Sequence, residues 1–257
     1  MEEQCNGRGH EKPIKQVFVD LSDSCAGCIF SGTKRDVYDC LKVEYAYNPT
    51  GLVLLSKRQI HSYKSEYFPH RSEIVRHGYL DVNIDNVGRV ICTAMQPYIG
   101  KDYIDVSEGA SSYEEKNFQE AITLAKITES SNAAVIAGCL NTSPTLTKGA
   151  IEPQFTHSLD VLRQAGFVDP ISASYYGSFP SCTFCFANSY VKEIYKSEGY
   201  DGYIMDHVLV KGYHVLNSGT SQEMGQNKYV YRVLMYDDRH VPFSAHYGVS
   251  VDFSVVP

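Results

Sequence analysis

Apolar runs bounded by turn-forming residues recur along most of the chain and predict β-strands. These runs are rich in valine, isoleucine and tyrosine, which favour extended backbone. Some runs are continuously apolar and others alternate with polar residues, a mixture that favours buried and half-buried strands in mixed sheets. The expected strands are 51–56, 79–84, 89–95, 133–138, 204–210, 229–236 and 247–253.

Two segments between these runs have apolar residues at helical spacing. The first lies within residues 111–130, where Ser112 and Glu115 have the spacing of a capping box. Its apolar face consists of Phe118, Ala121, Ile122 and Ala125. The second segment runs from about Thr156 to Ala165, and Gly166 is placed to end it. We therefore expect an α/β (α+β) sandwich in which two packed mixed β-sheets are flanked by helices.

Length and composition indicate one soluble globular domain. The chain has 257 residues, of which 43% are hydrophobic and 21% charged, and no linker interrupts it, so we expect a single domain over 1–257. No apolar stretch approaches the roughly 18 residues of a spanning helix, and the polar start does not resemble a signal peptide. The net charge of −7 repels phosphate backbones, and no basic patch offsets it. Nucleic acid is therefore not an expected partner.

The chain has eight cysteines, an even number that favours an oxidising compartment. We expect an extracellular or secretory location, with a precursor that has been trimmed. Two of the cysteines, Cys92 and Cys139, fall in or beside core strands and are expected to be free. The two Cys-x-x-Cys pairs are too far apart for a zinc ribbon, so disulfides of open connectivity are expected among the other six. These six are Cys5, Cys25, Cys28, Cys40, Cys182 and Cys185.

Five motifs, in this order, carry a resemblance to a known superfamily. They are GLVLLSKRQI (51–60), ICTAMQ (91–96), GCLNTSP (138–144), MDHVLVKG (205–212) and SAHYGVSVDF (244–253). Together they resemble strand-end motifs of the endonuclease/exonuclease/phosphatase superfamily, which includes deoxyribonuclease I and the neutral sphingomyelinases. The resemblance implies a deoxyribonuclease I-like fold and an ancestry among metal-dependent phosphodiesterases.

The same resemblance implies that much of the hydrolytic machinery has been replaced. Ala94 stands where the family has a histidine, and Cys139 and Ala245 stand where it has aspartates. Asn141, Asp206 and His246 keep the family's residue types, but we expect Asp206 to lack its partner and His246 to lack the carboxylate that orients it. The cysteine-rich segment 1–45 also lacks the family's first strand and the glutamate motif that binds Mg²⁺. We expect no confident catalytic residue, no bound metal and no cofactor.

Three functional hypotheses follow from this pattern. The first is a pseudoenzyme with a binding, structural or assembly role, holding a small apolar ligand in the former active-site cleft, lined by Asn141, Asp206, His246 and Cys139. A missing first strand would leave an open sheet edge, so another protein chain or a homo-oligomer is an expected partner. The alternative is a Mg²⁺-dependent phosphodiesterase, a nuclease or a sphingomyelinase-like enzyme, completed by a second chain. The third is that Cys139 acts as a nucleophile with His246, or joins His246 and Asp206 around a softer metal such as zinc.

Overall fold

The computed structural model describes the chain in several segments. They are residues 52–69, 77–98, 110–144, 154–173, 182–186, 188, 191, 202–220 and 246–255. The backbone of three further short strands is also described: β1 (Glu44–Tyr47), β11 (Arg232–Leu234) and β12 (His240–Pro242). Apart from the first two residues of β1, the cysteine-rich segment 1–45 therefore lies outside the described residues.

The largest element is a mixed sheet of five strands. In spatial order these are β3 (Ile60–Tyr67), β4 (Gly78–Ile84), β5 (Gly88–Ala94), β6 (Ala134–Cys139) and β9 (Asp206–Lys211). All neighbours are antiparallel except β5 and β6, which are parallel. A parallel pair needs a long crossover, and the segment that contains α4 (Tyr113–Ile127) supplies it.

The remaining described strands form two-stranded antiparallel pairs. β10 (Tyr213–Thr220) pairs with β13 (Val249–Val255), β2 (Val53–Ser56) with β1, β7 (Phe184–Cys185) with β8 (Gly202–Tyr203), and β11 with β12. Two more helices are α5 (Thr156–Gln164) and α6 (Pro170–Ala173). No helix in the described part of the chain combines the length and apolar character that crossing a bilayer requires.

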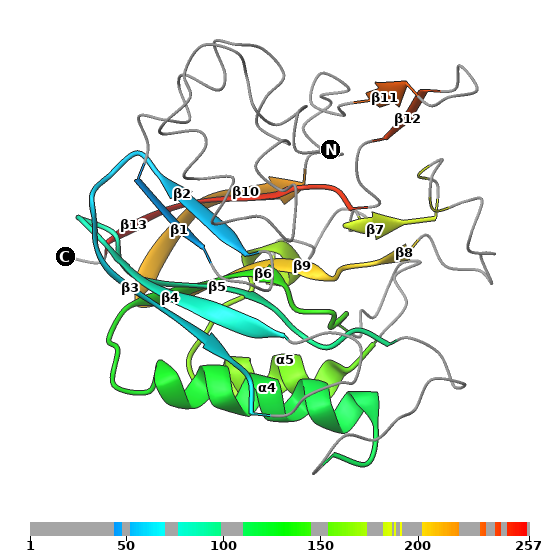
Figure 1. Ribbon diagram of the computed structural model, residues 1–257, viewed down its shortest axis with the longest axis horizontal. Coiled ribbons are helices and arrows are strands. Elements are labelled where there is room, and N and C mark those ends of the chain that lie inside the picture. The colour runs from blue at the N-terminus through cyan, green and yellow to red at the C-terminus, as the bar shows by residue number, and fades with distance from the viewer. Residues whose placement is uncertain are drawn as a thin grey trace.

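The five-stranded sheet lies between a helical layer and a second β layer (Figure 1). On one face, Ile91, Ile136 and Leu209 pack against Leu124 of α4 and Leu159 of α5. On the other face the alternate strand residues pack against β2, β10 and β13, and they include Leu80, Val82, Val90, Val135 and Val210. Because successive side chains of a strand point to opposite faces, one sheet separates two hydrophobic cores. The expected sandwich of packed β-sheets with helices is thus confirmed.

Each strand expected from the sequence overlaps an observed strand, with ends that differ by at most two residues, except that only 232–234 of the expected 229–236 is described as strand. Both expected helices are present, and Gly166 follows α5 with a φ of 91°. β3, β10 and the short strands β1, β7, β8 and β12 were not predicted. β3 lies at an edge of the five-stranded sheet and is largely exposed, so it lacks the apolar run that marks a buried strand. The apolar run of β10 is interrupted by Asn217, Ser218 and Gly219, residue types that are common in turns.

Ser112 caps α4, because its side-chain oxygen accepts a hydrogen bond of 3.1 Å from the Glu115 N–H. The return contact of the expected capping box is shifted by one residue: the Glu115 carboxylate accepts from the N–H of Ser111 at 2.6 Å. The start of the longest described helix is therefore fixed by its own sequence, which accounts for the accuracy of this prediction.

Buried polar side chains of α4 hold the ends of β5 and β6. The Asn117 amide donates to the carbonyls of Gln96 at 2.8 Å and Leu140 at 3.0 Å. The Gln96 N–H donates to Glu120 Oε2 at 2.6 Å. Burial raises the pKa of Glu120 to about 8, although the Gln96 N–H and the charge of Lys116 favour its ionised form. Asn117 thus ties together the ends of the two parallel strands, and Glu120, with its raised pKa, holds the end of β5.

We predict that Glu120→Gln stabilises the protein at pH 8 but not at pH 4.5. The unfolded chain releases the Glu120 proton near pH 4.5 and the folded protein near pH 8, so the folded state binds the extra proton between these values and its stability falls as pH rises. Glutamine keeps an acceptor for the Gln96 N–H and removes this dependence. The expected gain at pH 8 is on the order of 4 kcal/mol, measured by urea unfolding at both pH values. Glu114→Gln is the matched control on an exposed position of α4, and an equal effect of Glu120→Gln at both pH values would contradict the prediction.

Candidate functional site

The candidate site lies where β5, β6 and β9 end side by side. In the strand register Ala94 is opposite Cys139, and Cys139 is opposite Asp206. Three motifs that are far apart in the sequence therefore place these three residues in one row across the sheet. The row contains two of the substituted positions, Ala94 and Cys139, beside Asp206, which keeps the residue type expected from the resemblance.

The backbone around Cys139 is held close to β5. Gly138 has a φ of 144°, and a Cβ atom there would lie 1.8 Å from the carbonyl oxygen of Thr93, so only glycine fits. The Met95 N–H donates to the carbonyl of Cys139 at 2.9 Å. In return, Asn141, with a φ of 52°, donates from its side-chain amide to the carbonyl of Met95 at 2.7 Å. The Asn141 amide thus holds the backbone of the site in place.

His246 and Asp206 form a hydrogen-bonded pair of 2.6 Å between Nδ1 and Oδ2. The expectation that the orientation of His246 is unfixed is therefore wrong. Asp206, whose family partner is replaced by Ala94, pairs with His246 instead. His246 precedes β13 and forms a β-bridge with Phe184, which brings it to the start of β9. The pairing of these elements decides its partner, whereas the sequence suggested the neighbouring position 245. Ala245 itself lies outside the described residues.

The charge state of His246 follows from two opposing effects. Burial lowers the pKa of the imidazole, but the hydrogen bond and the negative charge of Asp206 outweigh burial, so the net effect raises the pKa. About a third of the His246 side chain remains exposed. The pair can therefore present a hydrogen-bonding, partly positive imidazole to a molecule in solution.

The segment 182–186 positions both members of this pair. The Thr183 hydroxyl oxygen accepts hydrogen bonds from the N–H groups of Met205 at 2.9 Å and Asp206 at 3.1 Å. The Phe184 ring lies 5.1 Å from the His246 ring. A disulfide links Cys182 with Cys185 and closes this short segment on itself. The sequence offered no reason to connect Thr183 or Phe184 with the site, because they become neighbours only when β7 meets β8 and the end of β9.

The eight cysteines differ in what the structure describes of them. Cys92 and Cys139 are free, whereas the disulfide candidates Cys5, Cys25, Cys28 and Cys40 lie outside the described residues. Burial and the nearby Asp206 carboxylate strongly raise the pKa of the Cys139 thiol. A nucleophilic cysteine needs a lowered pKa, so this geometry does not favour the hypothesis that Cys139 attacks a substrate.

Cys139, Asp206 and His246 form a cluster whose potential ligand atoms all lie within 4.8 Å of one another. Magnesium, the ion implied by the superfamily, binds oxygen ligands in near-octahedral geometry. The cluster offers one carboxylate, one imidazole and one thiol, and Ala94 beside it offers no ligand. This donor set does not fit magnesium.

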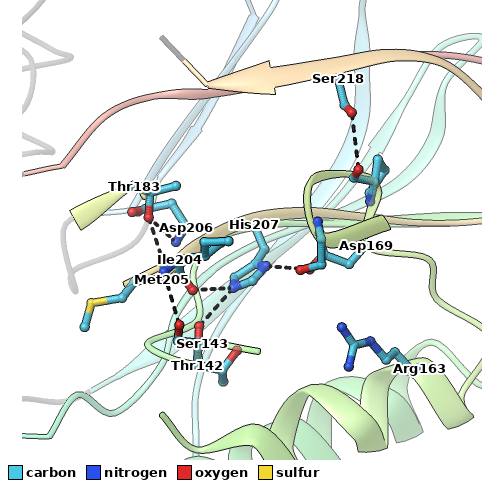
Figure 2. A network of polar contacts seen from close by, with 12 residues as sticks. Thr142, Ser143, Arg163, Asp169, Thr183, Ile204, Met205, Asp206, His207 and Ser218 are labelled. Carbon is cyan, nitrogen blue, oxygen red and sulfur yellow. Dashed lines mark hydrogen bonds and ion pairs between the residues drawn. The ribbon is translucent and has the colours of Figure 1, made fainter. Parts of the chain in front are cut away.

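A second histidine–carboxylate pair lies on the other face of β9. The fully buried His207 contacts Asp169 Oδ2 at 3.1 Å through Nδ1, and the carbonyls of Thr142 and Ile204 at 3.0 Å through Nε2 (Figure 2). Both ring nitrogens face acceptors, so the ring must carry two protons to donate to them. Burial opposes this charge, but Asp169 outweighs it and raises the pKa of His207.

The His207 pair holds the loop that follows Asn141. Besides the His207 contact to Thr142, the Ser143 hydroxyl accepts a hydrogen bond of 3.2 Å from the Ile204 N–H (Figure 2). The GCLNTSP loop is therefore attached to the segment before β9. Sequence reasoning missed His207 and Asp169. The alternation of side chains along MDHVLV was an available signal, because neighbours of Asp206 must point to the opposite face.

We predict that Asp169→Asn destabilises the protein by about 3 kcal/mol, because it leaves the buried, charged His207 without its counter-charge. Asp160→Asn is the matched control: Asp160 is exposed on α5 and its ion pair with Arg163 is a surface contact, so its loss is expected to change stability by less than about 1 kcal/mol. Chemical denaturation of the three proteins measures the difference. Equal stability of the two variants would contradict the role assigned to His207.

Comparisons with known proteins identify the fold. No protein-family model matches the chain, and no curated protein matches it. Solved structures do match. The 3′ phosphatase NExo from Neisseria, bound to product DNA hairpin, has a TM-score of 0.56 at 12% identity, covering 82% of this chain and 79% of that one.

Two further structures are similar over most of this chain. SmcL matches with a TM-score of 0.52 at 17% identity, covering 80% of this chain and 69% of the other. A mutant of beta toxin from Staphylococcus aureus with bound magnesium ions matches with a TM-score of 0.52 at 17% identity, covering 80% and 68%. The chain therefore shares the fold of these structures, the deoxyribonuclease I-like sandwich that the five sequence motifs predicted.

Proposed function

We propose that this chain is a ligand-binding protein on a phosphodiesterase fold and performs no Mg²⁺-dependent hydrolysis of its own. The observation that carries the proposal is the composition of the strand-end row. A neutral thiol at Cys139 lies between Ala94 and the His246–Asp206 pair. The partly exposed His246–Asp206 pair can contact a ligand. The described residues of the row supply too few oxygen ligands for magnesium.

Phosphodiester hydrolysis with magnesium needs an ion that neutralises the phosphoryl oxygens, a group that aligns water and a proton donor for the leaving group. In this chain Ala94 can neither donate a proton nor bind an ion. The side-chain amide of Asn141 donates to the backbone at Met95 and thereby serves the loop. The remaining pair, His246 and Asp206, can bind and orient a polar group.

The surroundings of His246 favour a ligand that combines an apolar body with one anionic group. Phe184 and Phe186 are buried, and Tyr203 and Met205 pack against them while remaining partly exposed. The imidazole, with its raised pKa, can donate a charge-assisted hydrogen bond to an anion. Aromatic rings beside a polar donor are a common composition of small-molecule sites. An aryl phosphate or aryl phosphodiester has both features and is a suitable probe.

We predict that the purified chain hydrolyses neither DNA, sphingomyelin nor a bis-aryl phosphodiester faster with Mg²⁺ than without it. The physical reason is that the thiol of Cys139, the carboxylate of Asp206 and the imidazole of His246 supply too few oxygen ligands for Mg²⁺. Release of the aryl alcohol or lipid headgroup over time measures the rate. A Mg²⁺-dependent rate that His246→Ala abolishes would refute the proposal and favour a phosphodiesterase instead, with the missing ligands coming from a second chain or from residues outside the described part.

We predict that the bis-aryl phosphodiester binds the chain and that His246→Ala weakens its binding at least about tenfold, because a hydrogen bond to a charged group is lost. Isothermal titration calorimetry measures both affinities. His157→Ala is the matched control, since His157 is an exposed histidine on α5. Loss of binding in both variants, or in neither, would count against a ligand site at His246.

The expected partner chain or homo-oligomer stays part of the proposal. β3 forms one edge of the described five-stranded sheet, and its Tyr63 is 49% exposed. Such an edge can accept a strand from another chain. Light scattering after size-exclusion chromatography tests this, and a monomer at all concentrations would argue against self-association.

The net charge of −7 argues against nucleic acid as the ligand. The secretory or extracellular location, expected from the number of cysteines, stays a prediction.

A further inference from the structure

We propose that Cys139, Asp206 and His246 form a binding site for a thiophilic divalent cation of the zinc class. The inference starts from the cluster itself: a sulfur, a carboxylate oxygen and an imidazole nitrogen, all within 4.8 Å of one another. They come from the end of β6, the start of β9 and the segment before β13. Residues of three separate segments converge on one point that remains partly open to solvent.

The spacing of the cluster suits a tetrahedral ion. Zinc bonds of about 2.3 Å to sulfur and about 2.0 Å to nitrogen or oxygen place neighbouring ligand atoms roughly 3.3 to 3.7 Å apart. The observed upper bound of 4.8 Å requires each ligand atom to move inward by no more than about 1 Å. Rotation of the side chains supplies such a movement without changing the strands.

The identities of the three ligands select the ion. Cysteine sulfur and imidazole nitrogen prefer zinc and other borderline or soft cations, whereas magnesium prefers oxygen. When the ion binds, the Cys139 thiol releases its proton to solvent. The ion takes the place of the proton between His246 Nδ1 and Asp206 Oδ2, so two coordinate bonds replace their 2.6 Å hydrogen bond.

The backbone around the three ligands is fixed before any ion arrives. Cys139 follows Gly138, whose close approach to Thr93 locks the end of β6. The Thr183 hydroxyl accepts from the N–H of Asp206, and the ring of Phe184 contacts His246. Since the ligands need little reorganisation, the cost of ordering them on binding is small. The segment closed by the Cys182–Cys185 disulfide therefore serves the site as a support.

Three protein ligands leave a fourth tetrahedral position. In zinc proteins this position accepts water or an anionic group of a bound molecule. If the chain binds an anionic ligand as proposed, the anionic group of that ligand occupies the fourth position and contacts the cation as well as the protein. The substitution of Cys139 for an acidic residue then changes the ion that the site selects.

The test is a cobalt titration of the full chain after removal of metal with a chelator. Co²⁺ takes the zinc position, and a thiolate bound to it gives a charge-transfer absorption in the near ultraviolet. We expect one equivalent of Co²⁺ to produce this band, equimolar Zn²⁺ to displace it, and a large excess of Mg²⁺ to leave it unchanged. Cys139→Ala is expected to remove the band, and His246→Ala to weaken Co²⁺ binding at least about tenfold.

Cys92→Ala is the matched control, because Cys92 is the other free cysteine among the described residues and lies on the neighbouring strand β5, facing the second β layer. It is expected to keep the band. A band that persists in Cys139→Ala would come from other cysteines and would overturn the inference, as would the absence of any band in the unmodified chain. Circular dichroism of each variant distinguishes loss of the site from loss of the fold.

The two proposals fail in different ways. If Co²⁺ and Zn²⁺ do not bind but the bis-aryl phosphodiester does, the metal site is wrong and the ligand-binding function stands. If Zn²⁺ binds and the zinc form hydrolyses the phosphodiester, the metal site is confirmed and the proposal that the chain only binds its ligand is wrong. Cleavage by the zinc form but not by Cys139→Ala would assign that activity to this cation.

Discussion

The parallel pairing of β5 with β6, flanked by β9, is the constraint on which the rest of the site depends. It sets Ala94, Cys139 and Asp206 in one row at the strand ends. A shift of one residue in either pairing would turn Cys139 or Asp206 to the opposite face of the sheet. The polar side chains of α4 and the bare backbone of Gly138 hold this register. The chemistry of the site is thus a consequence of sheet geometry.

Asp206 and His207 are adjacent in β9, so their side chains point to opposite faces of the sheet and have different roles. Asp206 points to the partly exposed side and orients His246. His207 points to the interior, where Asp169 compensates its charge and two carbonyls accept its second proton. One pair can meet a ligand, and the other supports the loop that carries Asn141. A buried charged pair contributes more to a unique arrangement than to net stability, since its desolvation offsets much of its attraction.

The thiol at position 139 changes what this arrangement can bind. Beside Asp206 a second carboxylate would add negative charge and oxygen ligands, the combination that attracts magnesium. A thiol adds neither while it is protonated, and it coordinates strongly once a soft cation displaces the proton. If both proposals hold, the loss of magnesium chemistry and the preference for a softer cation follow from the same residue, in a site whose supporting contacts are present.

The sequence by itself determined the fold class, most of the strands, both long helices and the order of five strand-end motifs, because apolar periodicity and helix caps are local signals. It also singled out Asn141, Asp206 and His246 as candidate site residues, and the structure brings Asp206 and His246 into contact. It could not predict β3, an exposed edge strand without an apolar run, β10, which contains three consecutive residues common in turns, or the short strands β1, β7, β8 and β12. It assigned the wrong partner to His246, since only the bridge between His246 and Phe184 brings that ring to Asp206. Likewise Thr183, Asp169 and His207 acquire their roles through contacts between distant segments, and only tertiary structure decides such contacts.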